Sequence, residues 1–195
     1  MKRLAGILAV VLVGALSATC VFDTRDAQPP GPVTGGCTLE TPEKAFNCMT
    51  GSLASQQNAD YERSISANFV FSPTLADSLD QNFIGTGVYD NWNKDVEMDV
   101  LELLFSDAQT TTVDFGSPSI LINKNTFVRY SVTYQLDVVT NAAPTDTTRY
   151  EGVAEIDVLN ENGNWRVTSW NEVETVAGSS TWGFLRGILR LRLNP

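Results

Sequence analysis

The spacing of apolar residues changes once along this chain, from a helical period to a strand period, and this change limits the possible folds more than any other feature. Up to Phe105 the apolar residues recur mainly at helical spacing, apart from one short run over 69–71, whereas from Val113 onward they alternate with polar residues. The longest alternation places six side chains on one face of a strand: Val128, Tyr130, Val132, Tyr134, Leu136 and Val138. Helices followed by antiparallel strands predict an α+β fold, a curved antiparallel sheet with helices packed on its concave face.

The first helix has a clear start signal. Thr41 can cap the helix, Pro42 suits its first position, and Glu43 favours the positive end of the helix dipole. The sequence then predicts a short helix over 59–65, a short strand over 69–71, a polar loop over 73–89 and a third helix over 92–105. Further strands are expected over 113–115, 120–122, 128–138 and 152–158. Asn162-Gly163 predicts a tight hairpin leading to a last strand with Trp165 and Trp170.

Residues 1–19 have the layout of a secretory signal peptide. Met1-Lys2-Arg3 is a short basic segment, and an apolar run over 4–16 follows it. This run is shorter than the roughly 20 residues that a membrane-spanning helix needs, and we expect no such helix in the mature protein. The leader predicts an exported protein.

Cys20 follows the small residues at the end of the leader, and here the segment resembles a bacterial lipoprotein signal, in which the cysteine is lipidated and becomes the new N-terminus. A secreted or periplasmic protein cut after Ser17 or Ala18 is the alternative. Residues 20–37 are rich in Pro, Gly and Thr and predict a flexible linker. We favour lipidation, which would tether the domain to a membrane of the cell envelope.

The chain has three cysteines, and the other two are Cys37 and Cys48. An exported chain meets an oxidising compartment, where thiols tend to pair. We therefore expect a disulfide between Cys37 and Cys48, with lipidation using the odd cysteine. The alternative is a buried Cys48 and a free Cys37.

Composition excludes several classes of function. The formal net charge is −10, and no basic stripe is evident before the C-terminal segment, which argues against nucleic-acid binding. Histidine is absent, which removes the commonest metal ligand and general base and every mechanism that depends on histidine. Asp95, Asp99 and Glu102 share one helical stripe but lack a calcium-binding loop, so we interpret them as a solvated face. No metal or cofactor is expected.

Several short motifs, in order, resemble the nuclear transport factor 2-like superfamily, which includes SnoaL-like and ketosteroid-isomerase-like proteins. They are Thr41-Pro42-Glu43 with Phe46, then Asp60-Tyr61, Asn68-Phe69-Val70-Phe71, Asn164-Trp165 and Trp170-Asn171-Glu172. Thr181-Trp182-Gly183 resembles a tail of bacterial lipoprotein members. The resemblance covers roughly residues 38 to 185 and implies a cone-shaped half-barrel with a pocket between sheet and helices, often dimeric through the outer face of the sheet. Such a fold hosts isomerases, dehydratases, cyclases and proteins without known activity.

The candidate pocket residues are Tyr130 and Tyr134 on the apolar strand face, Trp92, Phe69, and Asp60 as the best acid at the pocket edge. Family dehydratases depend on histidine and are excluded, whereas isomerase-like members need only a carboxylate with tyrosine or carboxylic acid donors. The sheet acids that we considered fall out of phase with the apolar positions, which argues against a buried catalytic carboxylate in the sheet: Asp114, Asp137, Glu151, Glu155 and Asp157. We assign no catalytic residue.

The C-terminal segment 179–195 is basic and apolar, and it has two interpretations. Its arginines, Arg186, Arg190 and Arg192, alternate with leucine and isoleucine, so it could lie on a membrane surface. It could instead pack on the domain, assigned to residues 38–178, with its arginines against acidic groups, which we favour.

Three functions remain open. We favour a non-catalytic envelope protein that binds a small apolar ligand or a protein partner. An isomerase-like or lyase-like enzyme with a tyrosine and carboxylate pocket is the second. A structural module that forms a homodimer through its sheet is the third.

Overall fold

A computed structural model describes residues 36–193. The predicted signal peptide, Cys20 and nearly all of the predicted linker lie outside the described residues. The described part contains five helices and six strands. The helices are α1 (Pro42–Ala54), α2 (Asn58–Ser64), α3 (Leu75–Ser78), α4 (Lys94–Asp107) and α5 (Trp182–Leu193). The strands are β1 (Ile65–Ser72), β2 (Ala108–Phe115), β3 (Ser119–Lys124), β4 (Phe127–Thr140), β5 (Ala143–Glu161) and β6 (Asn164–Thr175).

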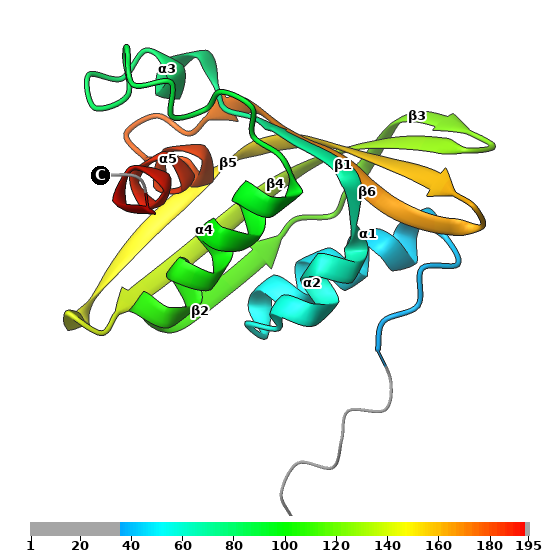
Figure 1. The fold of residues 1–195 in the computed structure, drawn as a ribbon, viewed down its shortest axis with the longest axis horizontal. Coiled ribbons are helices and arrows are strands. Elements are labelled where there is room, and N and C mark those ends of the chain that lie inside the picture. The colour runs from blue at the N-terminus through cyan, green and yellow to red at the C-terminus, as the bar shows by residue number, and fades with distance from the viewer. Residues whose placement is uncertain (1–35, 194–195) are drawn as a thin grey trace, which may run out of the picture. The chain divides into compact units, whose positions relative to one another are not determined.

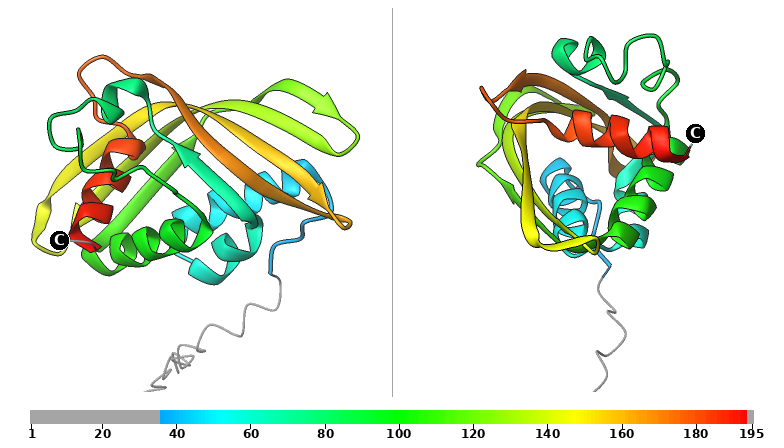
Figure 2. Two further views of the ribbon diagram at one scale, coloured as in Figure 1. Left: turned by 45° about the horizontal axis from the view of Figure 1, so that its top comes forward. Right: turned by 90° about the vertical axis from the view of Figure 1, so that its left-hand side faces the viewer.

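The strands form one curved, unclosed sheet in the order β1-β6-β5-β4-β2, with β3 also paired to β4. Helices α1, α2, α4 and α5 lie on its concave side (Figures 1 and 2). This is the predicted α+β cone, with one correction. The sheet is mixed and not wholly antiparallel, because β1 runs parallel to β6. These two strands are far apart in sequence, so no hairpin sets their relative direction.

Local signals explain where the elements begin and turn. The Thr41 hydroxyl accepts a hydrogen bond from the Lys44 amide at 3.2 Å, as a helix cap does. The third predicted helix begins at Lys94, two residues later than expected, because the side chain of Asn93 caps it by accepting from the Val96 amide at 3.1 Å. The Asn162-Gly163 hairpin has φ angles of 55° and 91° at its two central residues, the left-handed conformation that this dipeptide favours.

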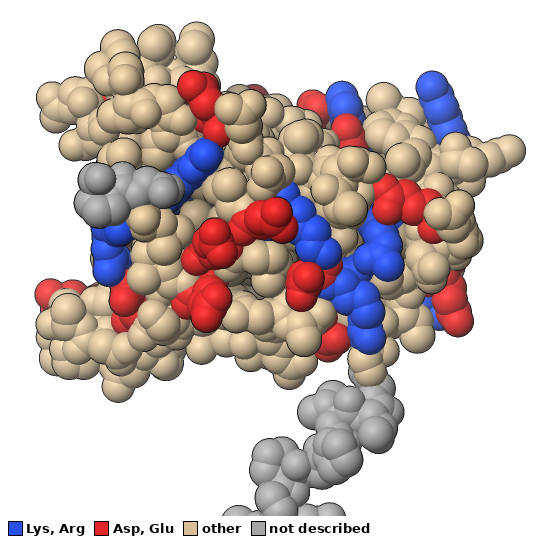
Figure 3. All heavy atoms as spheres, viewed as in Figure 1, with Lys and Arg blue, Asp and Glu red and all other residues tan. Residues whose placement is uncertain are grey.

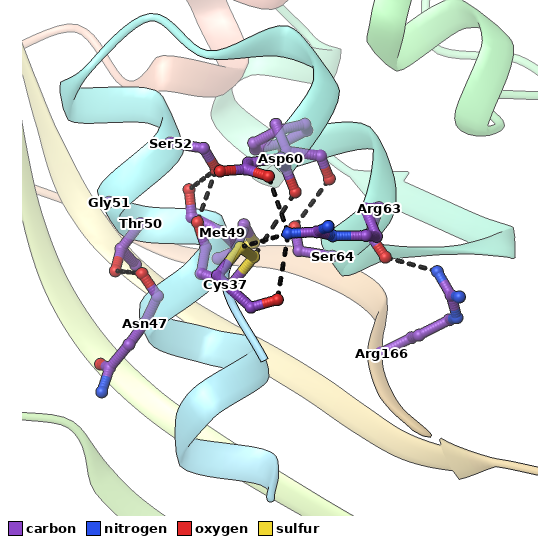
Figure 4. Close-up of a disulfide and its surroundings, with 12 residues drawn as sticks. Cys37, Asn47, Met49, Thr50, Gly51, Ser52, Asp60, Arg63, Ser64 and Arg166 are labelled. Atoms are coloured by element: carbon purple, nitrogen blue, oxygen red, sulfur yellow. Dashed lines mark hydrogen bonds and ion pairs between the residues drawn. A yellow bond between two sulfur atoms is a disulfide. The ribbon is translucent and has the colours of Figure 1, made fainter. Parts of the chain in front are cut away.

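A disulfide between Cys37 and Cys48 fastens the start of the domain to α1, with 5.3 Å between the two Cα atoms (Figure 4). Two further contacts hold the same segment. The Trp165 amide of β6 donates to the Leu39 carbonyl at 2.7 Å, and Arg63 of α2 donates to the Cys37 carbonyl at 3.0 Å. The entering chain is therefore fixed to α1, α2 and β6 at once.

The C-terminal segment is the helix α5, and it packs on the domain. Its buried residues include Trp182, Leu185 and Leu189. Gly187 lets the helix approach the 73–93 segment closely, since an added Cβ would meet the Phe83 ring at 2.8 Å. In the described structure this segment therefore packs on the domain, which is the second of its two interpretations.

The other arginines of α5 also contact the domain. Arg190 donates to the Val88 carbonyl at 2.7 Å and lies 5.1 Å from the ring centre of Trp92, whereas Arg192 pairs with Asp107 of α4 at 2.5 Å. Within residues 36–193 the structure has no helix that is both long and apolar enough to cross a membrane.

Candidate functional site

The concave face of the sheet receives four of the five candidate pocket residues. Tyr130 and Tyr134 of β4, Phe69 of β1, and Trp92 just before α4 are all buried, each with no more than 4% of its surface exposed. Asp60 instead lies on α2, where its carboxylate pairs with Arg63 at 2.8 Å and its side chain is 24% exposed (Figure 4). The structure thus groups the aromatic residues in the cone and leaves Asp60 apart from them.

A fully buried arginine from α5 lies among three further aromatic residues of the core, Phe71, Trp170 and Trp182. Arg186 has 0% of its surface exposed. Its guanidinium carbon lies 4.5 Å from the ring centre of Phe71 and 4.6 Å from those of Trp170 and Trp182. Cations over aromatic faces are attracted by the negative face of the ring, more strongly where water is excluded. The interior of the cone therefore holds a desolvated cation supplied by the chain itself.

Glu97 of α4 is the first carboxylate that faces this cation. Its Oε1 lies 2.6 Å from Nη2 of Arg186 and accepts a hydrogen bond from the Tyr61 hydroxyl at 2.8 Å. Its Oε2 accepts from the indole Nε1 of Trp92 at 2.9 Å. Both oxygens of this buried carboxylate are satisfied, as a buried charge requires. Burial, with the neighbouring Glu97 charge next in size, raises the pKa of Tyr61 well above its ordinary value.

Glu172 of β6 is the second carboxylate. Its Oε1 lies 3.7 Å from Nη1 of Arg186 and accepts from the indole of Trp170 at 2.8 Å, while its Oε2 accepts a 2.5 Å hydrogen bond from the Tyr134 hydroxyl. The same hydroxyl accepts from the Trp182 backbone amide at 3.1 Å. Burial raises the pKa of Glu172 to about 7, against the lowering influence of Arg186 and the two hydrogen bonds. Burial, followed by the Glu172 charge, also raises the pKa of Tyr134. We call these four residues, Arg186, Glu97, Glu172 and Tyr134, the interior cluster.

Sequence reasoning missed three members of the interior cluster, although two left a signal. Glu172 lies two residues after Trp170 on the same strand and so faces the same side. It is 5% exposed, so the sheet does carry a buried carboxylate, at a position that is not among the five sheet acids considered from the sequence; of those five, Asp157 is also buried, at 9%. Glu97 precedes Leu101 and Leu104 at helical spacing on the buried face of α4. Arg186 shares a helical stripe with Trp182 and Leu189, but a long arginine at such a position can extend to solvent, so the stripe alone did not indicate its burial.

Two hollows on the surface of the described domain have no lining from the charged groups of the interior cluster, which are Arg186, Glu97 and Glu172. One of about 280 Å³ touches Tyr134 midway along β4 and β5, beside the end of β2, but neither Arg186 nor either glutamate lines it. Another, of about 480 Å³, lies between α2 and α4 and is lined by Asp95, Asp99, Glu102, Glu62, Asn58 and Met98. Figure 3 shows the acidic side chains gathered on this face. Among residues 36–193, no group of His, Cys, Asp or Glu side chains is arranged to hold a metal ion.

Comparison with known proteins identifies the fold of this chain but not its function. No protein-family profile matches the sequence, and no curated protein matches it. Among solved structures, one assigned as a scytalone dehydratase from Novosphingobium aromaticivorans superposes with a TM-score of 0.54 at 11% identity, over 71% of this chain and 89% of that one. A hexachlorocyclohexane dehydrochlorinase, LinA type 2, gives 0.51 at 8% identity over 70% and 86%.

A third structure is assigned as a calcium/calmodulin-dependent protein kinase II association domain, from Xanthomonas campestris. It gives a TM-score of 0.51 at 8% identity, over 69% of this chain and 86% of that one. These neighbours show that the chain has the nuclear transport factor 2-like fold, as its motifs implied. They comprise two proteins assigned as enzymes and one as an association domain, so the function has to be argued from the interior cluster.

Proposed function

We propose that this chain is an exported, lipid-anchored protein of the bacterial cell envelope, and that its domain is a non-catalytic module that binds a protein partner. The leader over 1–19, Cys20 after small residues and the linker over 20–37 support export and anchoring. The absence of histidine supports a non-catalytic role.

The buried guanidinium of Arg186 favours a protein partner over a small apolar ligand. It lies in the cone with 0% exposure, between two carboxylates and against three aromatic rings. An apolar ligand in the same space would have to displace this charge and leave Glu97 and Glu172 buried without a counter-ion. Breaking a buried ion pair in this way costs about 3–5 kcal/mol. The outer surface is thus the better candidate for recognition.

Native mass spectrometry of the full-length protein, extracted gently from the membranes of its own host, tests this proposal. We expect a mass excess from lipid on Cys20 and no retained small molecule, and in-cell cross-linking should give a defined protein partner. The Cys20→Ala variant is the matched control and should lose both the lipid mass and the membrane association. A stoichiometric apolar molecule released on unfolding would overturn the proposal. A homodimer without another partner would favour the structural module.

One observation favours the enzyme alternative. Glu172 has a pKa of about 7 and touches the Tyr134 hydroxyl, a pair that resembles the base and donor of an isomerase-like or lyase-like site. Such a site should bind a phenol as a mimic of an enolate intermediate. Titration with a substituted phenol, followed by tryptophan fluorescence, tests this. A saturable change in the wild type that Glu172→Gln weakens would support the enzyme, whereas no change supports the binding module.

A further inference from the structure

We infer that the interior of the cone is a binding site for a guanidinium group, and that this chain fills the site with its own Arg186. The ligand class is an alkylguanidinium, such as the end of an arginine side chain. Such a site would be present whether or not the protein is exported or binds a protein partner.

The walls of the site match both parts of a guanidinium ion. A guanidinium is planar, with weakly hydrated faces and donors around its edge. The rings of Phe71, Trp170 and Trp182 lie within 4.6 Å of its central carbon. Glu97 meets one edge nitrogen at 2.6 Å, and Glu172 lies 3.7 Å from another. Aromatic faces and carboxylates placed together are the groups that recognise this cation in preference to a neutral molecule.

Most of these walls belong to elements other than α5. Phe71 is on β1, Glu97 on α4, and Trp170 and Glu172 on β6; of the groups around the guanidinium described above, only Trp182 is on the same helix as Arg186. The carboxylates are also oriented by groups outside α5. Tyr61 and Trp92 hold Glu97, and Trp170 and Tyr134 hold Glu172. A site whose walls are held in place by their own partners is preorganised for the cation.

Arg186 leaves part of the hydrogen-bonding capacity of this site unused. Its Nε and Nη1 are buried without a hydrogen-bond partner among the described residues, and the same is true of the indole Nε1 of Trp182. Two buried carboxylates face this position, so a cation is required there. Because the guanidinium of Arg186 is covalently attached to α5, its Nη1 stays 3.7 Å from Glu172. A free alkylguanidinium has no such attachment and can settle between both carboxylates.

The test removes the internal ligand and offers a free one. Arg186→Ala deletes the atoms that correspond to ethylguanidinium. We expect ethylguanidinium at millimolar concentration to raise the midpoint temperature of this variant saturably, with a change in tryptophan fluorescence that saturates at the same concentration. Propylammonium, a cation without the planar fork, should need at least about a tenfold higher concentration, and ethylurea, which is planar but neutral, should have no effect.

Two controls make the outcome decisive. The wild type and Arg192→Ala, which truncates an exposed arginine of the same helix, should show no saturable response. If Arg186→Ala is unfolded, the same compounds are added during refolding, and only ethylguanidinium should restore the native circular dichroism spectrum. Equal effects of ethylguanidinium and propylammonium, or none from either, would overturn the assignment of a guanidinium site.

Discussion

Two regions of this molecule pair arginine with carboxylates in opposite surroundings. On the outer face of the sheet, Arg129 of β4 contacts Asp157 of β5 through two hydrogen bonds at 2.6 and 2.8 Å, and the two side chains are 32% and 12% exposed. Inside the cone, Arg186 contacts Glu97 at 2.6 Å with neither side chain exposed. The shortest nitrogen–oxygen distance is the same in the two pairs, but only the outer pair is in contact with solvent.

The difference lies in what would replace each pair when it is broken. At the outer face, water can take the place of a lost partner, so such pairs contribute little to stability. In the interior, a lost partner leaves a charge without solvation, which is costly even where the intact pair adds little net stability. We therefore expect the interior cluster to favour one arrangement of α5, and substitution of Arg129 to cost little. Four predictions test this contrast, and the largest expected effect comes first.

Replacing Arg186 by methionine should give the largest effect. Methionine fills similar space but leaves Glu97 and Glu172 buried without a cation, and we expect a loss of about 3–5 kcal/mol in the free energy of unfolding. Urea denaturation measures it. Arg192→Met on the same helix is the matched control, and its loss should stay below about 1 kcal/mol. Equal losses in the two variants would contradict the contrast.

Glu172 should make stability depend on pH. Its pKa is about 7 in the folded protein and 4.5 as an ordinary carboxyl, so the folded state holds the proton more tightly. Its stabilising contribution is therefore fully present below about pH 4.5 and is lost as the pH rises through 7, by about 3 kcal/mol in all. The groups that face it are Tyr134, Trp170 and Arg186, with the charge of Asp77 also acting on it. Glu172→Gln should remove this dependence from unfolding curves between pH 5 and 8; an unchanged pH profile would contradict the prediction.

Tyr134 and Tyr130 form a matched pair on one face of β4. Both are buried. The Tyr134 hydroxyl donates to Glu172 and accepts from the Trp182 amide, whereas the Tyr130 hydroxyl has no hydrogen-bond partner among the described residues. We expect Tyr134→Phe to lower the free energy of unfolding by about 1–3 kcal/mol, because it strips two buried groups of a partner. Tyr130→Phe should change it less. Thermal unfolding of both variants makes the comparison, and the reverse ranking would show that the cluster is not the stabilising feature.

Arg129→Ala should have the smallest effect, below about 1 kcal/mol, although it removes two short hydrogen bonds to Asp157. The effect should shrink further in high salt, because ions screen exposed charges. Chemical denaturation at low and high salt measures both. A loss that matches that of Arg186→Met would remove the distinction between the two regions.

The fold was largely predictable because its signals are local. The alternation from Val128 to Val138 and the Asn162-Gly163 turn are properties of neighbouring residues, and they fixed most of the sheet. The parallel pairing of β1 with β6 was not predictable in this way, since it joins strands from opposite parts of the chain.

The candidate site was only partly predictable for the same reason. The strand period shows which face the tyrosines occupy, but the helical period of α5 does not distinguish a buried arginine from one that extends to solvent. The burial of Arg186 depends on Glu97 of α4, far away in the sequence, and on Glu172 of the preceding strand meeting it in space. Pairings between a helix at the end of the chain and residues about 90 positions earlier leave no trace in a local window.

The disulfide at the start of the domain has a mechanical consequence in the proposed anchored protein. Tension along the tether would arrive at Cys37 and pass through the sulfur bridge to Cys48 in the middle of α1. The intervening backbone, including the hydrogen bond from Trp165 to Leu39, would carry almost none of the force. Force on the anchor would thus act on the packed helix α1, and the hydrogen bond between residue 39 and the start of β6 would be protected.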